Sequence, residues 1–510
     1  MGLSPWLLPA LIAIPFFGGL AALYAERLSL TWPRWIGLLS MLATMILAIL
    51  IWVQADIPPM VPAGGAPAWL VEFQVDWIPR WGVSIHLGLD GLGLLMILLT
   101  GALGVLSVAC SWREIQQYVG FFHLNLLWNL AGVMGVFMAL DLFLFFVFWE
   151  VMLVPMYFLI ALWGHSSRGG RSRVYAATKF FIFTQASGLL MLIAILALVW
   201  LHRENTGEWS FDYQHLLGTP LASWQEYLLM LGFFVGFAVK LPIVPLHPWL
   251  PDAHSQAPTA GSVDLAGVLL KTGAYGLMRF VLPLFPHASH EFAPIAIGLG
   301  VVGILYGAKL ALVQADIKRL VAYTSVSHMG FVLVGIYAGS TLALEGAIVL
   351  MLAHGLATGG LFVLCGELYE RLHTRELGDM GGLARRAPHY ATALMFFALA
   401  SLGMPGLGNF VGEFLVLIGS FPVSPWMTAV AATGLILAAV YSLYVVQRAL
   451  HGPPAHDEVV EDLTRREILM MGSIMASLLL LGLFPQPVID LARGSVAQIA
   501  YWYALGAPAP

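Results

Sequence analysis

The sequence contains little charge and almost no cysteine. Charged residues make up only 10% of its 510 residues and hydrophobic residues make up 60%, whereas soluble proteins have about 25% charged residues. This composition indicates an integral membrane protein. The two cysteines, Cys110 and Cys365, lie in separate apolar runs. They can supply neither a disulfide framework nor the four thiolates of an iron–sulfur cluster, so redox chemistry within this chain is not expected.

Motifs for phosphate binding, metal ligation and nucleophilic catalysis are also lacking, so no cofactor, metal ion or nucleic acid is expected to bind the chain. The stretch GLGVVG, residues 298–303, fits the spacing of a dinucleotide-binding loop. However, it lies inside an apolar run with no strand before it. Gly303 and Gly307 form a G-x-x-x-G pair, which favours close packing between membrane helices.

What the sequence has in abundance is apolar stretches of about 20 residues, the length that crosses a bilayer. Fourteen are predicted, near residues 4–24, 35–54, 86–110, 119–139, 142–163, 178–201, 226–249, 263–283, 292–312, 319–338, 342–366, 389–420, 425–447 and 467–488. Sixteen basic residues lie on the side reached after odd-numbered spans and four on the other side. Because inner loops collect Lys and Arg, both termini are expected outside.

Three of the 23 basic residues remain, and each lies inside an apolar span. Lys309 is close to the inner end of its span, where it can extend to the interface. Lys240 and Lys271 lie about two turns or more from either predicted end. A charge at such depth costs roughly 2.5–3.5 kcal/mol on insertion scales, so a functional role is favoured for these two lysines.

Acidic and histidine residues inside the spans extend this set. Together with Lys240 and Lys271, the spans contain Glu150, His328, His354 and Glu413. Proton carriage needs titratable groups connected by water or by small movements. Burial lowers the pKa of a lysine and a nearby carboxylate raises it, so a lysine that meets and then loses a carboxylate can act as a proton switch.

Structural explanations stand beside this functional one. A lone membrane histidine is often only a hydrogen-bond donor between helices, which applies to His354 and to His328 with its flanking Ser325 and Ser327. Glu150 can also be explained as the partner of an interfacial arginine. The set is more informative than its members, because accidental charges are not expected in so many separate spans.

Two of the predicted spans are interrupted. Pro242, Pro245 and Pro248, with Pro251 after them, follow Lys240, and Pro405 lies among glycines shortly before Glu413. Proline removes a backbone donor and breaks a helix, and interrupted helices can hold water or ions at membrane depth. Kinks that serve packing alone are the alternative. We expect the breaks to give the buried Lys240 access to water.

The interrupted spans, seven and twelve, are an odd number of spans apart and therefore cross in opposite directions. This predicts an all-α polytopic fold with two inverted five-helix repeats, each containing a broken helix. The expected units are residues 1–118 with the first three spans, 119–284 and 285–448 as the two repeats, and 449–510 with the last span and a tail.

Four long segments carry a family resemblance: FFVFWEVMLVPMYFLIALWG, AVKLPIVPLHPWLPDAHSQAPTAGSVDLAGVLLKTGAYGLMRF, DIKRLVAYTSVSHMGFV and GMPGLGNFVGEFLVL. They resemble the antiporter-like proton-channel subunits of respiratory complex I, the bacterial NADH-quinone oxidoreductase. The M type is favoured over the L and N paralogues, partly because the chain ends soon after span fourteen and lacks the long lateral helix of the L type.

The resemblance implies roles for the buried groups. Glu150 and Lys240 would be the interacting acid and base of one half-channel. Lys271, His328 and His354 would form a central hydrophilic axis, and Glu413 would be the terminal proton carrier of the other half-channel. Lys309 has no counterpart in the family pattern, so the resemblance assigns it no role.

The resemblance also implies the setting. The chain would be a proton-translocating subunit of the enzyme in the bacterial inner membrane, with both termini periplasmic, L and N paralogues on either side, and lipid, water and protons as its other partners. Flavin mononucleotide, iron–sulfur clusters and most of the quinone site would lie in other subunits. Two other functions are considered: a subunit of a cation/proton antiporter or energy-converting hydrogenase, and a non-pumping scaffold that binds quinone or lipid.

Overall fold

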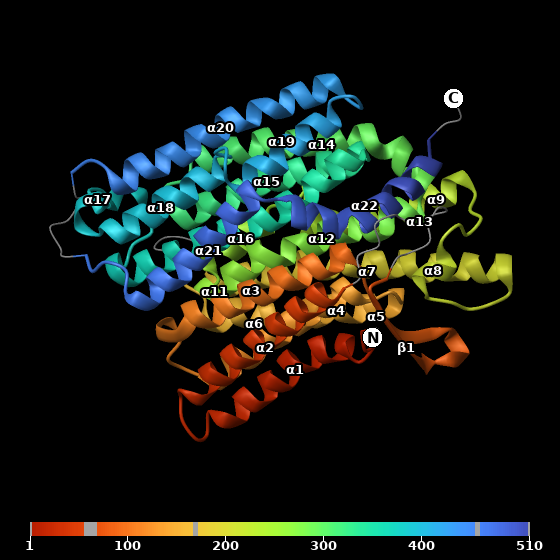
Figure 1. Ribbon diagram of the computed structural model, residues 1–510, viewed down its shortest axis with the longest axis horizontal. Coiled ribbons are helices and arrows are strands. Elements are labelled where there is room, and N and C mark those ends of the chain that lie inside the picture. Colours follow the sequence, from red (N-terminus) through yellow and green to blue (C-terminus); the bar gives the residue numbers. More distant parts are fainter. Residues whose placement is uncertain (1–2, 56–68, 167–171, 454–459, 508–510) are drawn as a thin grey trace.

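The structure is a computed structural model that describes residues 3–55, 69–166, 172–453 and 460–507. It is a bundle of long helices, with α1 (Leu7–Ala25) and α2 (Trp32–Gln54) at one flank and α20 (Pro425–Leu450) at the opposite flank (Figure 1). The predicted all-α polytopic fold is confirmed.

The remaining helices follow in chain order. The first half contains α3 (Gly91–Glu114), α4 (Val119–Met138), α5 (Leu142–Val151), α6 (Leu153–Trp163), α7 (Arg173–Thr206), α8 (Tyr213–Leu216), α9 (Ser223–Lys240), α10 (Trp249–Gln256), α11 (Thr259–Asp264), α12 (Leu270–Gly276) and α13 (Leu282–Leu284). The second half contains α14 (Pro286–Leu312), α15 (Ile317–Ala338), α16 (Thr341–Leu372), α17 (Leu383–Arg386), α18 (Pro388–Ser401), α19 (Gly408–Ser420), α21 (Arg465–Leu483) and α22 (Gln486–Leu505).

Twelve helical segments of the described chain are long and apolar enough to cross a membrane. They correspond to twelve of the fourteen predicted spans. The other two are spans seven and twelve, the proline-interrupted ones, which the structure divides into α9 with α10 and α18 with α19. The boundaries of the four predicted units, 1–118, 119–284, 285–448 and 449–510, stay a prediction.

The N-terminal end of predicted span three is wrong. Residues 86–89 belong to a β-hairpin of β1 (Val71–Ile78) and β2 (Val83–Leu89), paired antiparallel around the short helical turn Pro79–Trp81, and α3 begins only at Gly91. The hairpin is seen at the lower right of Figure 1, where β1 is labelled. In VEFQVDWI, apolar residues alternate with polar ones, which is the period of a strand.

The C-terminal end of predicted span seven is also wrong, because α10 continues the interrupted span to Gln256. The helix does not continue to residue 249, because Lys240 is the last residue of α9 and an irregular segment follows over residues 241–248. Pro242 and Pro245 lie inside that segment and Pro248 closes it. Pro251 does not break the helix, since it lies in the first turn of α10, where its missing donor costs nothing.

The last predicted span, 467–488, merges two helices. α21 ends at Leu483 and a separate helix, α22, occupies most of the expected tail. Pro485 and Pro487 stand at this junction. α22 contacts α3, α14 and α16, and it begins one residue after Pro485, where a proline readily starts a helix.

Glycines allow α14 and α15 to pack closely against each other. A Cβ atom added at Gly307 would approach the backbone nitrogen of Ser327 to 2.7 Å, and one at Gly300 would approach the carbonyl oxygen of Gly330 to 2.8 Å. The GLGVVG stretch therefore packs helices, as predicted, and lies within α14.

Candidate proton-transfer site

Lys240 occupies an apolar pocket at the end of α9. Its side chain is completely buried, and the Nζ atom lies 5.6 Å from the ring centre of Trp149 and 5.1 Å from that of Phe180. Nζ has no hydrogen-bond partner among the described residues. The ring faces provide cation–π attraction, and three donors remain for other partners.

The break after Lys240 is held by α10. The indole nitrogen of Trp249 donates a hydrogen bond of 2.9 Å to the carbonyl oxygen of Val239. This satisfies one of the carbonyl groups that the end of α9 leaves without a helical donor. The backbone is therefore fixed beside Lys240 even though the helix stops there.

Glu150 lies near the end of α5 and faces α7. A Cβ atom at Gly188 would come within 2.7 Å of its Oε1 atom, so the glycine makes room for the carboxylate. No ion pair joins Glu150 to Lys240 or to an arginine within the described part of the chain, although Lys240 is close enough to act on it electrostatically. Gln185 of α7 also lies near it, and Oε1 has no hydrogen-bond partner among the described residues.

Lys271 is placed by an unusual stretch of helix. It lies in α12, between two π-helical segments, Leu265–Leu269 and Leu277–Val281, and π-bulges are frequent at functional sites. Nζ lies 2.8 Å from Nδ1 of His354 on α16 and also donates to the carbonyl of Ala266. A charged lysine can only donate, so in that state of Lys271 Nδ1 accepts and His354 carries its proton on Nε2.

His328 and Glu413 extend this contact. The rings of His354 and His328 are 5.4 Å apart between centres, and Nδ1 of His328 lies 2.8 Å from Oε1 of Glu413. On the other side of the His328 ring, Nε2 is 3.1 Å from the hydroxyl of Tyr441. Four of the six predicted residues, Lys271, His354, His328 and Glu413, thus form one buried polar chain, each at most 1% exposed.

The second break lies directly against Glu413. Residues 402–407, with Pro405 among them, separate α18 from α19. Gly403 has a φ of 78°, and a Cβ atom there would lie 2.7 Å from Oε2 of Glu413. Only a glycine adopts this backbone readily and leaves room for the carboxylate. Oε2 has no hydrogen-bond partner among the described residues.

His254 was missed by the sequence reasoning. It lies on α10, fully buried, with its ring stacked on Phe362 at 5.2 Å. Both ring nitrogens lack partners in the described chain, and Lys271 and Lys318 are close enough to act on it electrostatically. The signal was present, because His254 follows the proline segment, but the predicted span ended at residue 249.

Two charges that the sequence assigned to loops and their flanks are buried. Arg279 was counted with the outward loops, yet it is 1% exposed and forms an ion pair with Asp90. Lys318 was counted with the inner loops, yet it is 3% exposed and its Nζ donates to the carbonyl of Ala257. Lys309, by contrast, is exposed near the end of α14, where its side chain can reach an interface as expected.

The described residues contain no group of three His, Cys, Asp or Glu side chains suited to a metal ion. Cys110 and Cys365 are both free and buried. The titratable side chains form a line in space, and each one contacts the next. This arrangement suits the passage of protons from group to group.

Comparisons with known proteins agree with this arrangement. Residues 139–438 match the family described as NADH:quinone oxidoreductase/Mrp antiporter, TM. NADH-quinone oxidoreductase subunit M of Pseudomonas aeruginosa is 61% identical over 97% of this chain and 98% of its own length. The Escherichia coli K12 protein of that name is 58% identical over 98% of both chains. The chain belongs to the NADH-quinone oxidoreductase subunit M family.

Solved structures share the fold of this chain. A chain in the structure of respiratory complex I from Thermus thermophilus with bound NADH has a TM-score of 0.86 and 32% identity, covering 98% of this chain and 100% of that one. A chain of the Mrp complex from Dietzia has a TM-score of 0.82 at 22% identity and shares the fold. The predicted resemblance to the antiporter-like subunits is confirmed at the level of the family.

Proposed function

We propose that this protein is the antiporter-like membrane-arm subunit of a bacterial NADH-quinone oxidoreductase and that it translocates protons through its buried side chains. The observation that carries the proposal is the buried series Lys271, His354, His328 and Glu413. Its members are titratable side chains, with contacts of 2.8 Å at each end and, between the two histidines, tilted rings whose centres are 5.4 Å apart. Burying such groups is costly and would gain a passive scaffold nothing.

Two half-channels would meet at this chain. In the first, Lys240 would hold a proton while Glu150 is near and release it when the carboxylate moves away, because an opposite charge favours the protonated amine. Lys240 has no fixed partner in its pocket, so its interactions can change. In the second, Glu413 would pass the proton outward beside the break at residues 402–407.

The two pairs of groups support the inverted repeat. Glu150 and Lys240 stand on spans five and seven, and His328 and Glu413 on spans ten and twelve, five spans later in each case. Along the chain, the acid Glu150 precedes the base Lys240, whereas the acid Glu413 follows the base His328. Each pair lies beside its broken helix, which is the arrangement expected if the two halves cross the membrane in opposite senses.

His254 is proposed to connect the inner surface with the central chain. Its unpartnered nitrogens and its proximity to Lys318 and Lys271 support this role. Buried polar atoms without protein partners are commonly satisfied by ordered water. Water molecules at His254 would provide the steps between the inner end of the bundle and Lys271.

The setting follows the family. The relatives are named as subunits of NADH-quinone oxidoreductase, so we place this chain in the bacterial inner membrane, between L and N paralogues, with both termini periplasmic. Flavin mononucleotide, iron–sulfur clusters and the quinone site would belong to other subunits. An Mrp-type antiporter subunit is not favoured, because the relatives named subunit M are 58% and 61% identical over nearly the whole chain, whereas the Mrp chain is only 22% identical.

Replacement of His354 by phenylalanine tests the proposal. The variant keeps an aromatic ring but removes the contact between Lys271 and His328. NADH-driven proton uptake into vesicles containing the intact complex should fall at least about ten-fold, since loss of one acid–base group costs about 10²–10⁴ in proton-transfer steps. His451→Phe, at an exposed site, is the matched control. A His354→Phe complex that assembles and pumps at the parental rate overturns the proposal.

A further inference from the structure

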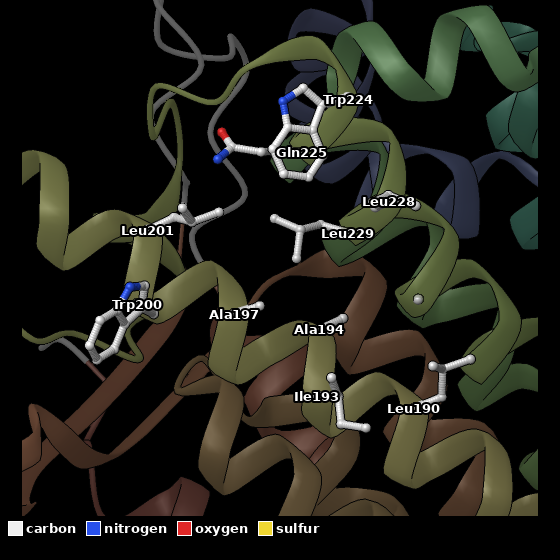
Figure 2. A pocket seen from close by; sticks show the side chains of 11 residues that line it. Leu190, Ile193, Ala194, Ala197, Trp200, Leu201, Trp224, Gln225, Leu228 and Leu229 are labelled. Atoms are coloured by element: carbon white, nitrogen blue, oxygen red, sulfur yellow. The ribbon is translucent and has the colours of Figure 1, made fainter.

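A groove between α7 and α9 is not used by the proton-transfer site. It has a volume of about 480 Å³ and is lined almost entirely by apolar side chains of these two helices. Figure 2 shows Ala194, Ala197 and Leu201 of α7 facing Leu228 and Leu229 of α9 across it. This volume is within the range of about 300–1,000 Å³ that binding pockets have.

The groove is open toward the surroundings of the bundle. Ile193 is 64% exposed and Leu228 is 60% exposed, and their helices belong to the membrane-spanning bundle. The lining residues of α7 run from Leu190 to Leu201, a length of about 17 Å at 1.5 Å per residue. The groove is therefore long and narrow, a shape that suits an extended hydrocarbon chain.

Polar and aromatic groups mark one end of the groove only. Trp200 and Trp224 flank this end, where α7 finishes and α9 starts (Figure 2). Tryptophan prefers the level of the lipid headgroups. One turn beyond Trp200, the guanidinium of Arg203 lies over the rings of Trp200 and Trp209, at 5.9 and 4.7 Å from their centres.

The charges at this end have both signs. Glu204 follows Arg203 and accepts a hydrogen bond of 3.1 Å from the indole nitrogen of Trp200. Glu208 is also exposed. One cation beside two carboxylates is a poor match for a headgroup with two negative charges, but it matches a headgroup that has a phosphate and an ammonium group.

We propose that this groove binds a zwitterionic phospholipid with a primary ammonium headgroup, such as phosphatidylethanolamine. One acyl chain occupies the groove between α7 and α9. The phosphate contacts Arg203, and the ammonium group contacts Glu204. The bound lipid then fills the space between a helix that faces Glu150 and the helix that ends at Lys240.

Native mass spectrometry of the intact detergent-extracted complex tests this proposal, after titration with phosphatidylethanolamine, phosphatidylglycerol or cardiolipin. Ala197→Phe, which fills the groove, should remove one bound phosphatidylethanolamine. Leu196→Phe is the matched control, because Leu196 is on the same helix and exposed but does not line the groove. Arg203→Gln and Glu204→Gln should each weaken retention by about two- to five-fold, the value of an exposed ion pair.

Three results would overturn the proposal. The first is an equal lipid count for Ala197→Phe and Leu196→Phe. The second is a preference for phosphatidylglycerol or cardiolipin over phosphatidylethanolamine at this site. The third is a cross-link from an Ala197→Cys variant to another subunit, which would show a protein helix in the groove; the native cysteines are buried. None of these results depends on whether the chain pumps protons.

Discussion

At the scale of single residues, Lys240 and Lys271 are buried in different ways. Lys271 has two hydrogen-bond partners, whereas Lys240 is surrounded by aromatic rings and has no hydrogen-bond partner in the described chain. A lysine with fixed partners can hold a proton in one place. One without them can exchange its partner, which is the property that a switch needs.

The Lys240→Arg variant tests whether Lys240 carries protons or acts only as a fixed positive charge. A guanidinium cannot release its proton at physiological pH, so the variant should pump at a small fraction of the parental rate, as should Lys240→Ala. The measurement is NADH-driven proton pumping in reconstituted vesicles at matched levels of assembly. Parental pumping by the arginine variant would mean that Lys240 acts only as a charge.

Glu150 should act on the buried lysine and not on folding. Its side chain has room beside Gly188, and its Oε1 atom has no hydrogen-bond partner among the described residues, so its loss should leave assembly intact. Glu150→Ala should greatly reduce pumping, and Glu150→Asp should retain part of it. Normal pumping by a fully assembled Glu150→Ala complex would be incompatible with the proposed role.

Most residues of the candidate site were predictable from the sequence, because a charge inside an apolar run stands out. Their order was not predictable. Spacing along the chain does not reveal that His328 meets Glu413, 85 residues away. His254 was missed because predicted span seven ended at residue 249, and boundaries depend on capping and tertiary contacts that composition does not record. Arg279 lies inside predicted span eight, and its ion pair joins it to Asp90, 189 residues away.

At the scale of elements, the two broken helices have different supports. A tryptophan side chain from α10 holds the first break, and a glycine with positive φ forms the second. The sequence predicted both breaks, since proline and glycine act locally. It did not predict the hairpin, because an alternating strand next to a long apolar run is easily absorbed into the predicted span. It did not predict α22 as a separate helix either.

The first break should control the rate and not the chemistry. A Pro242→Ala, Pro245→Ala variant keeps Lys240 but allows the helix to extend past it. Pumping should fall while a part of it survives, in contrast to Lys240→Ala. Pro251→Ala is the matched control, because Pro251 lies in the first turn of α10. Equal pumping by both proline variants would show that the irregular segment has no role in hydration.

The hairpin has a pH-sensitive clamp at its base. His86 on β2 contacts Glu72 at 2.7 Å and also Asp212. Burial opposes protonation of His86, but its hydrogen bonds to the two carboxylates and their charges raise its pKa overall. A raised folded-state pKa stabilises the clamp fully below the ordinary histidine pKa of about 6.5, and this contribution is lost as the pH rises through the raised value.

Hydrogen exchange in the hairpin measures this effect. After correction for intrinsic rates, amides of β1 and β2 should exchange faster at about pH 9 than at about pH 6, two values on either side of the ordinary histidine pKa. His86→Gln should remove the difference, because the amide does not titrate. A pH response that persists in His86→Gln would assign the effect to another group.

At the scale of the whole molecule, the distribution of Lys and Arg predicts which way the bundle crosses the membrane. Part of that evidence, Arg168 and Arg171, lies outside the described residues, as does position 458, in a loop that the sequence predicts to be inside. The predicted orientation in the membrane can be tested at exposed positions on opposite ends of the described bundle. Glu376 follows span eleven and should be inside, and Glu208 follows span six and should be outside.

Cysteine labelling in intact cells and in inverted vesicles decides the orientation. A Glu208→Cys variant should react with a membrane-impermeant maleimide in intact cells, and a Glu376→Cys variant only in inverted vesicles. The native Cys110 and Cys365 are buried, so the unmodified chain provides the background. The reverse pattern would invert the molecule and place both termini inside. Glu413 would then face the wrong side to release protons, and the proposed direction of transfer would have to be abandoned.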